Sequence, residues 1–410
     1  MEYLRFIQQN RRFLGFGLLA AALSGFGQTF FVSLFSDPIR SAFDLGHGGF
    51  GLYYGLATLG SAAAVIVVGR LLDRVDLRLF AVGAVAGLAL GAALLGVAGS
   101  LLTLLLALFL LRLCGQGLMA HMALSSMARY FDAQRGRALG IATLGLPLAE
   151  ALLPVTAVAL MAVLSWQKVW LGVAAVLLML GAPSLLGLLR GHGVRRRRID
   201  AQAHEQTAAA RWRRRDVLRD VRLYLLLPAV VAAPTAVTFL FFHQVHIAES
   251  RGWSLEWMAG SFMGFAAAHV VGLLYGGPWV DRITARRSLP LALMPLAVGL
   301  ALATVVEASW VVPAYMALAG LSAGVGAPAI NALWAELYGV QNLGAIRALA
   351  HAAMTVATAL SPPVTGWMLD VGVPVDGVVG LLFLAVVAAA MLAHVARNAR
   401  ARHTPRAGAC

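Results

Sequence analysis

Stretches of about 20 apolar residues recur along the whole chain, and each is long enough to cross a bilayer core of ~30 Å. With 60% hydrophobic and only 12% charged residues, a soluble fold could not keep this much apolar surface out of water. The alternation typical of barrel strands is absent, which leaves helices as the spanning element. The sequence therefore predicts an all-α membrane protein with twelve transmembrane helices. They lie near residues 14–35, 49–69, 79–99, 102–127, 138–162, 169–189, 221–245, 256–279, 289–308, 310–335, 345–368 and 376–396.

One motif occurs twice, at equivalent positions between apolar stretches. Gly69-Arg-Leu-Leu-Asp-Arg-Val-Asp-Leu-Arg78 returns 208 residues later as Gly277-Pro-Trp-Val-Asp-Arg-Ile-Thr-Ala-Arg286. The same offset relates Ile39 to Ile247 and Pro154 to Pro362. Each half has six predicted crossings, an even number, so both halves enter the membrane from the same side. This predicts two six-helix bundles related by pseudo-twofold symmetry about the membrane normal.

Positive charge is distributed unevenly between the predicted loops. Of the 32 Lys and Arg, 28 lie in segments that one topology places in the cytoplasm, together with both termini. Six of the nine tryptophans fall at the opposite interface, as an aromatic belt would. The net charge of +14 is thus a topology signal, and nothing resembles a nucleic-acid-binding module. The predicted parts are an N-terminal bundle (1–190), a basic cytoplasmic linker (191–220), a C-terminal bundle (221–396) and a cytoplasmic tail (397–410).

The duplicated loop motif resembles the signature of the major facilitator superfamily, roughly Gly-x-x-x-Asp-Arg followed by basic residues. Twelve helices, a long central loop and the second copy of the motif extend this resemblance over the whole chain. The loop Tyr130–Gly140 looks like that of bacterial organic-anion and monocarboxylate-type members. The stretches Gly27–Phe35 and Phe241–Gln244 instead resemble an unassigned proteobacterial subgroup. The Gly-x-x-x-Gly-Pro signature of drug exporters is replaced by Gly145-Leu-Pro-Leu-Ala-Glu150. The resemblance implies a monomeric transporter in the bacterial inner membrane that works by alternating access.

Two strongly charged residues lie deep in predicted helices. Arg112 is about 10 residues from the outer end of helix 4, or ~15 Å deep at 1.5 Å per residue. Glu150 lies at a similar depth in helix 5. A charge there costs at least ~2.5–3.5 kcal/mol unless it faces a cavity or a partner. The residues are therefore candidates for a substrate counter-ion (Arg112) and a proton acceptor (Glu150). A structural ion pair within the N-terminal half is the alternative.

Other polar and aromatic residues complete the predicted site. In the family fold helix 5 faces helix 8, and helix 2 faces helix 11, so His269 and His351 could share the transported proton. Plain packing is the alternative for each of these histidines. The candidate substrate-binding residues are Arg112, Gln28, Gln116, Tyr53, Phe239, Phe265 and Asn331. The resemblance implies gating roles for Asp73, Arg74, Asp281 and Arg282, and His243 at the outer end of helix 7 is a further gating candidate.

The sequence predicts a proton-coupled secondary transporter of a small solute, for which an organic anion is the favoured substrate class. The alternative is an efflux pump that exports drugs, siderophores or metabolites by proton antiport. No Gly-x-x-x-x-Gly-Lys-Ser/Thr loop occurs, so ATP is not the expected energy source. No hydrolase elbow or His-Glu-x-x-His helix indicates an enzyme, and the spacing of Cys and His predicts neither a cofactor nor a metal. The expected partners are the substrate, protons and lipid.

Overall fold

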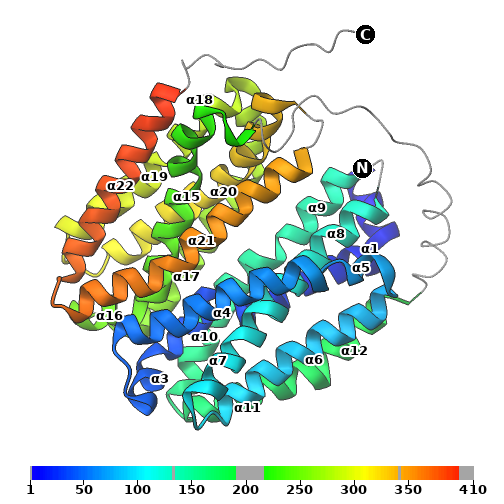
Figure 1. Cartoon of the computed structure of the whole chain (residues 1–410). Coiled ribbons are helices and arrows are strands. Elements are labelled where there is room, and N and C mark those ends of the chain that lie inside the picture. Colours follow the sequence, from blue (N-terminus) through cyan, green and yellow to red (C-terminus); the bar gives the residue numbers. More distant parts are fainter. Residues whose placement is uncertain (1, 132–133, 191–216, 340–342, 397–410) are drawn as a thin grey trace. The chain divides into compact units, whose positions relative to one another are not determined.

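The computed structural model describes residues 2–131, 134–190, 217–339 and 343–396. All regular elements in these ranges are helices, which confirms the predicted fold class (Figure 1). The chain forms two compact units, and one contains Met1–Gln206 together with Phe241–His246. The other contains Thr207–Leu240 and Ile247–Cys410. The first unit therefore includes a short piece of chain from beyond the central loop.

The first unit contains the helices before the central loop. Their bounds are α1 Glu2–Leu23, η1 Ser24–Gly27, α2 Thr29–Val32, η2 Ser33–Phe35, α3 Ser36–Phe43, α4 His47–Val68, α5 Leu71–Arg74, α6 Leu77–Gly96, α7 Leu101–Leu110, η3 Leu111–Met119, α8 Ala120–Tyr130, α9 Arg135–Thr143, α10 Gly145–Met161, α11 Trp166–Val176, η4 Leu177–Gly181 and α12 Ala182–Leu188. In the second part of the chain they are α15 Val221–Phe242, α16 Gln244–Ser250, α17 Leu255–Ile283, α18 Ala285–Ala292, α19 Met294–Val305, α20 Val311–Tyr338, α21 Leu343–Asp370 and α22 Val375–Ala396.

Within the described residues, ten helices or helix pairs are long and apolar enough to cross a membrane. An eleventh span is the first crossing, which is bent by 44° between Leu4–Gly27 and Thr29–Phe43. The one remaining predicted span, 345–368, corresponds to α21, which has 28 residues but is less apolar. Its polar residues recur every three or four positions, which places them on one face of the helix. They are Arg347, His351, Thr355, Thr358, Ser361 and Thr365.

Small residues set the closest helix contacts in both units. In α6 a Cβ added to Gly87 would lie 2.5 Å from Cys114 Sγ, and one added to Gly91 would lie 3.0 Å from Leu111 N. In the second unit a Cβ on Gly272 of α17 would lie 2.8 Å from the Cα of Gly324 in α20. Gly91 and Gly272 leave no room for a side chain because neighbouring backbone occupies the space, whereas at Gly87 the space is filled by the Cys114 side chain. Close backbone approach therefore positions the helices that carry the buried polar groups.

The two copies of the loop motif make different contacts. In the first copy, Arg78 Nη2 donates to the Leu189 carbonyl oxygen at 3.1 Å, beyond the C-terminal end of α12. In the second copy, Arg286 Nε lies 3.3 Å from the carboxylate of Glu336 near the end of α20. Glu336 also accepts from the Ala285 amide at the start of α18, at 2.7 Å. In both copies a charged side chain meets a helix end of favourable polarity. The helix is α12 in the first half and α18 in the second.

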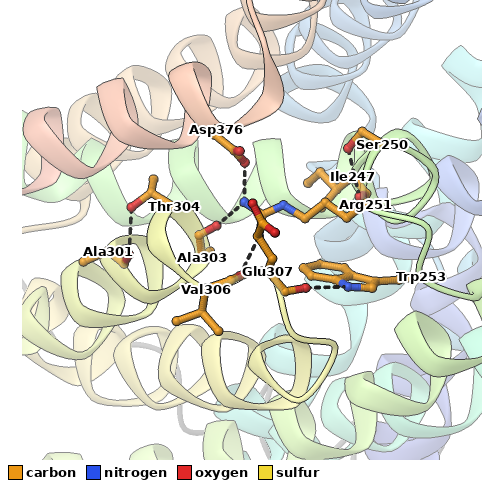
Figure 2. Close-up of polar contacts among 10 residues, drawn as sticks. All are labelled: Ile247, Ser250, Arg251, Trp253, Ala301, Ala303, Thr304, Val306, Glu307 and Asp376. Carbon is orange, nitrogen blue, oxygen red and sulfur yellow. Dashed lines mark hydrogen bonds and ion pairs between the residues drawn. The ribbon is translucent and has the colours of Figure 1, made fainter.

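Arg251 joins three elements of the second unit (Figure 2). Its guanidinium donates to the carbonyl oxygens of Ala303 and Val306, the latter at 2.8 Å, and so caps the C-terminal end of α19. It also pairs with Asp376 at the start of α22. The indole Nε1 of Trp253 donates to the Glu307 carbonyl oxygen at 3.1 Å. The Arg251 side chain is 9% exposed, whereas that of Asp376 is 54% exposed.

This difference in exposure predicts unequal mutational effects. Arg251→Ala removes bonds from a cation to two helix-end carbonyls, each worth about 1.5–3 kcal/mol, and should clearly lower the thermal unfolding midpoint of purified protein. Asp376→Asn removes only a solvent-screened ion pair, worth about 0–1 kcal/mol, and should change it little. Equal effects of the two substitutions would show that the ion pair, and not the helix cap, stabilises this end of the unit.

Candidate functional site

The first span is interrupted where the predicted site begins. The α-helical path ends at Leu23, a single turn follows at Ser24–Gly27, and Gln28 is extended with φ −85° and ψ 157°. The Phe31 and Val32 amides both donate to the Gln28 carbonyl oxygen. The Phe31 amide therefore does not bond to Gly27, which would be its partner in a continuous α-helix. An interrupted helix leaves backbone polar groups in the membrane that need other partners. In transporters such interruptions often lie at the substrate site.

The span that carries Arg112 is also irregular. Between α7 and α8, the segment η3 (Leu111–Met119) is wound as a π-helix within one continuous span, Leu101–Tyr130. A π-helix holds one more residue per turn than an α-helix, which changes the direction of the side chains, and such segments are frequent at functional sites. Arg112 is the second residue of this segment.

The two irregular segments cross at a pair of glycines. A Cβ added to Gly115 would lie 2.6 Å from the Cα of Gly27, and one added to Gly27 would lie 2.8 Å from the Cα of Gly115. The backbones therefore touch with no room for a side chain on either residue. This contact brings the carbonyl group of Gly27 within reach of the guanidinium of Arg112.

Arg112 is 3% exposed and is surrounded by neutral groups. Its Nη1 donates to the Gly27 carbonyl oxygen at 3.2 Å, and its Nε donates to Thr58 Oγ1 at 3.1 Å. Its Cζ lies 4.9 Å from the centroid of the Tyr54 ring, a cation–π distance. The Tyr54 hydroxyl in turn donates to Thr29 Oγ1 at 2.9 Å. The broken first span, α4 and η3 thus each contribute to one polar cluster, which we call the Arg112 cluster.

No acidic side chain forms a salt bridge with Arg112 among the residues that the structure describes. Glu150 of α10 is 4% exposed and belongs to the same unit. Its neighbour Ala149 contacts η1, because a Cβ on Gly25 would lie 2.7 Å from the Ala149 Cβ. Both charged residues thus lie beside the interrupted first span, and the alternative of a structural ion pair stays a prediction.

Three predicted substrate contacts lie on the same spans as the cluster without being part of it. Gln28 lies at the interruption and is partly exposed, Gln116 is exposed on η3, and Tyr53 is partly exposed on α4. Their side chains make no hydrogen bond within the described ranges. All three groups therefore remain available to a ligand that enters the first unit.

The remaining candidates belong to the second unit. Phe239 is fully buried and Phe265 is 2% exposed. The ring of His269 lies 5.7 Å from that of Phe265, in an edge-on arrangement. Asn331 of α20 is exposed, and its backbone carbonyl oxygen accepts from Arg347 at 2.8 Å. His351 is exposed on the polar face of α21.

The gating candidates differ in exposure. Arg74, Asp281 and Arg282 are exposed, whereas the Asp73 side chain lies outside the described part of the structure. His243 is 3% exposed and lies in the segment Phe241–His246, which packs within the first unit. Its ring centroid is 5.9 Å from that of His47. The described residues contain no group of three His, Cys, Asp or Glu suited to a metal ion.

A polar anchor holds the segment Phe241–His246 against the first span. The buried amide of Gln244 donates to the Phe30 carbonyl oxygen at 2.9 Å and to Ser33 Oγ at 2.8 Å. The Ser33 hydroxyl donates to the Phe241 carbonyl oxygen at 2.6 Å. These bonds lie just after the interruption at Gln28, so the segment Phe241–His246 is fixed to the part of the first span that follows the interruption.

Tyr54, Thr58 and Thr29 are site residues that are absent from the predicted substrate-binding set. Each lies on a span whose residue types are unremarkable, and their spacing relative to Arg112 depends on the π-helix and the glycine crossing. The Gly115-x-Gly117 pair beside Arg112 was the one available signal, since closely spaced glycines permit backbone contact.

Comparisons with known proteins decide the family. The model of the Major Facilitator Superfamily matches residues 17–270 and 246–409. The chain belongs to the major facilitator superfamily. It is accordingly a multi-pass membrane protein and a secondary transporter, not an enzyme, with small molecules as the substrates expected of such a transporter. A search of curated protein sequences found no match.

Solved structures of similar fold agree with this assignment. A bacterial homolog to the human lysosomal transporter Spinster, in an inward-facing and unoccupied conformation, is 15% identical with a TM-score of 0.66. The match covers 94% of this chain and 95% of that one. The inward-facing and occupied conformation gives 16% identity and a TM-score of 0.65, with 97% and 96% covered. At this identity the likeness shows the fold alone.

The glycine crossing of this major facilitator protein gives a second prediction. Gly115→Ala places a methyl group against the backbone of Gly27. Backbone cannot move aside as a side chain can, so we expect the free energy of unfolding to fall by at least about 1–3 kcal/mol. Size-exclusion chromatography of the purified protein should show less folded material, and thermal unfolding should show a lower midpoint. Gly83→Ala is the matched control, since a Cβ there meets nothing within 4 Å. If Gly115→Ala is as stable as Gly83→Ala, the crossing is not a tight contact.

Proposed function

We propose that this transporter carries a small organic anion, whose negative group neutralises Arg112 during transport, and that transport is coupled to protons through Glu150. The observation that supports this most is the neutral surroundings of Arg112, which consist of a carbonyl oxygen, a hydroxyl group and a tyrosine ring. A buried cation without a counter-charge is costly in the membrane, so an anionic ligand gains from meeting it.

The interrupted first span supports the same position for the ligand. An anion that approaches Arg112 would replace neutral acceptors at the guanidinium with charged ones, and bonds between charged groups are shorter and stronger. Gln28 and Gln116 offer amide donors beside it. Because Arg112 is only 3% exposed, binding requires that the surrounding groups move, as alternating access would provide.

The polar face of α21 supports an aqueous path in the second unit. Its hydroxyl and basic side chains would be unfavourable against lipid, and polar residues in spanning helices usually face protein or a water-filled cavity. We place His351 and Asn331 on that path. His269 and His351 remain candidates for sharing the proton with Glu150.

Transport by purified protein in liposomes tests the role of Arg112. Uptake of labelled carboxylates should fall at least ~10-fold in Arg112→Gln, because one charge-assisted bond of about 1.5–3 kcal/mol is lost and 1.4 kcal/mol corresponds to a factor of ten. Arg70→Gln, which removes an exposed arginine of α4's cytoplasmic end, is the matched control and should transport normally.

A second readout covers the case in which Arg112→Gln does not fold. The wild-type protein should prefer each carboxylate over its uncharged amide, at equal size and shape. Equal transport of acid and amide, or unchanged uptake by a folded Arg112→Gln protein, would contradict the counter-ion role.

Proton coupling is tested at Glu150. Glu150→Gln keeps the size of the side chain but cannot exchange a proton, so it should fail to accumulate substrate under a pH gradient. Exchange of internal for external substrate should persist, because it needs no net proton movement. Accumulation at the wild-type level by this variant would exclude Glu150 as the proton carrier.

A further inference from the structure

A continuous apolar groove runs along the outside of the second unit between α18–α19 and α22. It consists of two hollows with volumes of about 540 Å³ and 510 Å³. Met294 and Val387 line both hollows, so the two are continuous. Each volume lies within the range of about 300–1,000 Å³ that is usual for ligand pockets.

The groove exists because two helices are joined by a break. α18 contains Pro290 and ends at Ala292, and α19 begins again at Met294 with Pro295 in its first turn. Proline lacks an amide donor and prevents a continuous helix here. The side chain of Met294 is 39% exposed beside this break, and it opposes Met391 of α22, which is 63% exposed.

Basic side chains line one end of the groove only. Arg287 and His394 line the first hollow, are both exposed, and make no hydrogen bond or ion pair within the described residues. No acidic residue lines either hollow. The far end is formed by Thr304 and Val305. The predicted topology places the Arg287 end at the cytoplasmic face of the membrane.

The whole groove, from Arg287 to Val305, spans 18 residues, or ~27 Å at 1.5 Å per residue, which is close to a full hydrocarbon core of ~30 Å. One leaflet corresponds to the half nearest Arg287, which reaches to about Ala297. A lipid whose phosphate meets Arg287 would therefore place its acyl chain along the first hollow and end near the second.

We propose that this groove binds an anionic phospholipid of the cytoplasmic leaflet, with an acyl chain between α18 and α22 and the phosphate group at Arg287 and His394. The apolar lining favours the chain, and the exposed guanidinium favours a net negative headgroup over a neutral one. The nitrogen atoms of His394 can donate a further hydrogen bond to phosphate. This site is separate from the Arg112 cluster and does not depend on the proposed substrate.

Native mass spectrometry of the full-length detergent-purified protein tests the proposal. Phosphatidylglycerol and phosphatidylethanolamine with identical acyl chains are added in turn, and the bound lipid is counted. The wild-type protein should retain phosphatidylglycerol more strongly. Arg287→Gln combined with His394→Gln should weaken phosphatidylglycerol binding about 5-fold or more and phosphatidylethanolamine binding less, since loss of the guanidinium charge matters most for the headgroup with a net negative charge.

Two further variants make the result specific. Met391→Trp fills the first hollow and should reduce binding of both lipids, whereas Arg70→Gln removes an exposed arginine from the first unit and should reduce neither. Equal binding of the two lipids to the wild-type protein would overturn the proposal. So would undiminished phosphatidylglycerol binding by the double variant, or a dimer that persists when lipid is added, which would make a second copy the occupant.

Discussion

The hydrogen bond from Arg112 to the Gly27 carbonyl oxygen is the interaction on which the candidate site depends. It requires a helix interruption that frees the carbonyl group, a π-helix that directs the guanidinium, and two glycines that let the backbones touch. Without the π-helix or the glycine contact, a charged side chain and an unpaired carbonyl group would both lie in the membrane interior. Without the interruption, the carbonyl group would bond within the helix and the guanidinium would lose this acceptor. The irregular backbone and the buried charge therefore stabilise each other, and neither would persist alone.

Gene duplication supplied two similar halves, but the structure uses them differently. An offset of 209 residues, one more than that of the loop motif, relates Gly115 to Gly324, yet Gly115 meets the first span whereas Gly324 meets Gly272 of α17. Arg78 caps the end of α12, while its counterpart Arg286 pairs with Glu336. The repeat thus preserves where small and basic residues occur, and the neighbours of each position decide what they do. Among the described residues, Arg222 of the second half is also buried, but it pairs with Asp220 at 2.7 Å, whereas the partners of Arg112 are neutral groups.

The fold could be predicted from the sequence because the length of each apolar stretch and the distribution of Lys and Arg between the loops can both be read directly from the residues. The burial of Arg112 and Glu150 was also predictable, since depth follows from position along a helix. The partners of Arg112 were not predictable. They depend on the interruption at Gln28 and on the π-helix, and neither has a distinct composition. α21 shows the same limit, because its polar face lowers its hydrophobicity although the helix is long enough to span. Gln244 was visible as a residue, but its bonds to the first span required the structure.

An experimentally determined map of the protein in a lipid nanodisc, without substrate, tests the central claim most directly. The account predicts density for a helix that is interrupted between Ser24 and Gln28, with the guanidinium of Arg112 against the Gly27 carbonyl group and no carboxylate beside it. A continuous α-helix through these residues, or an acidic side chain in a salt bridge with Arg112, would contradict the account.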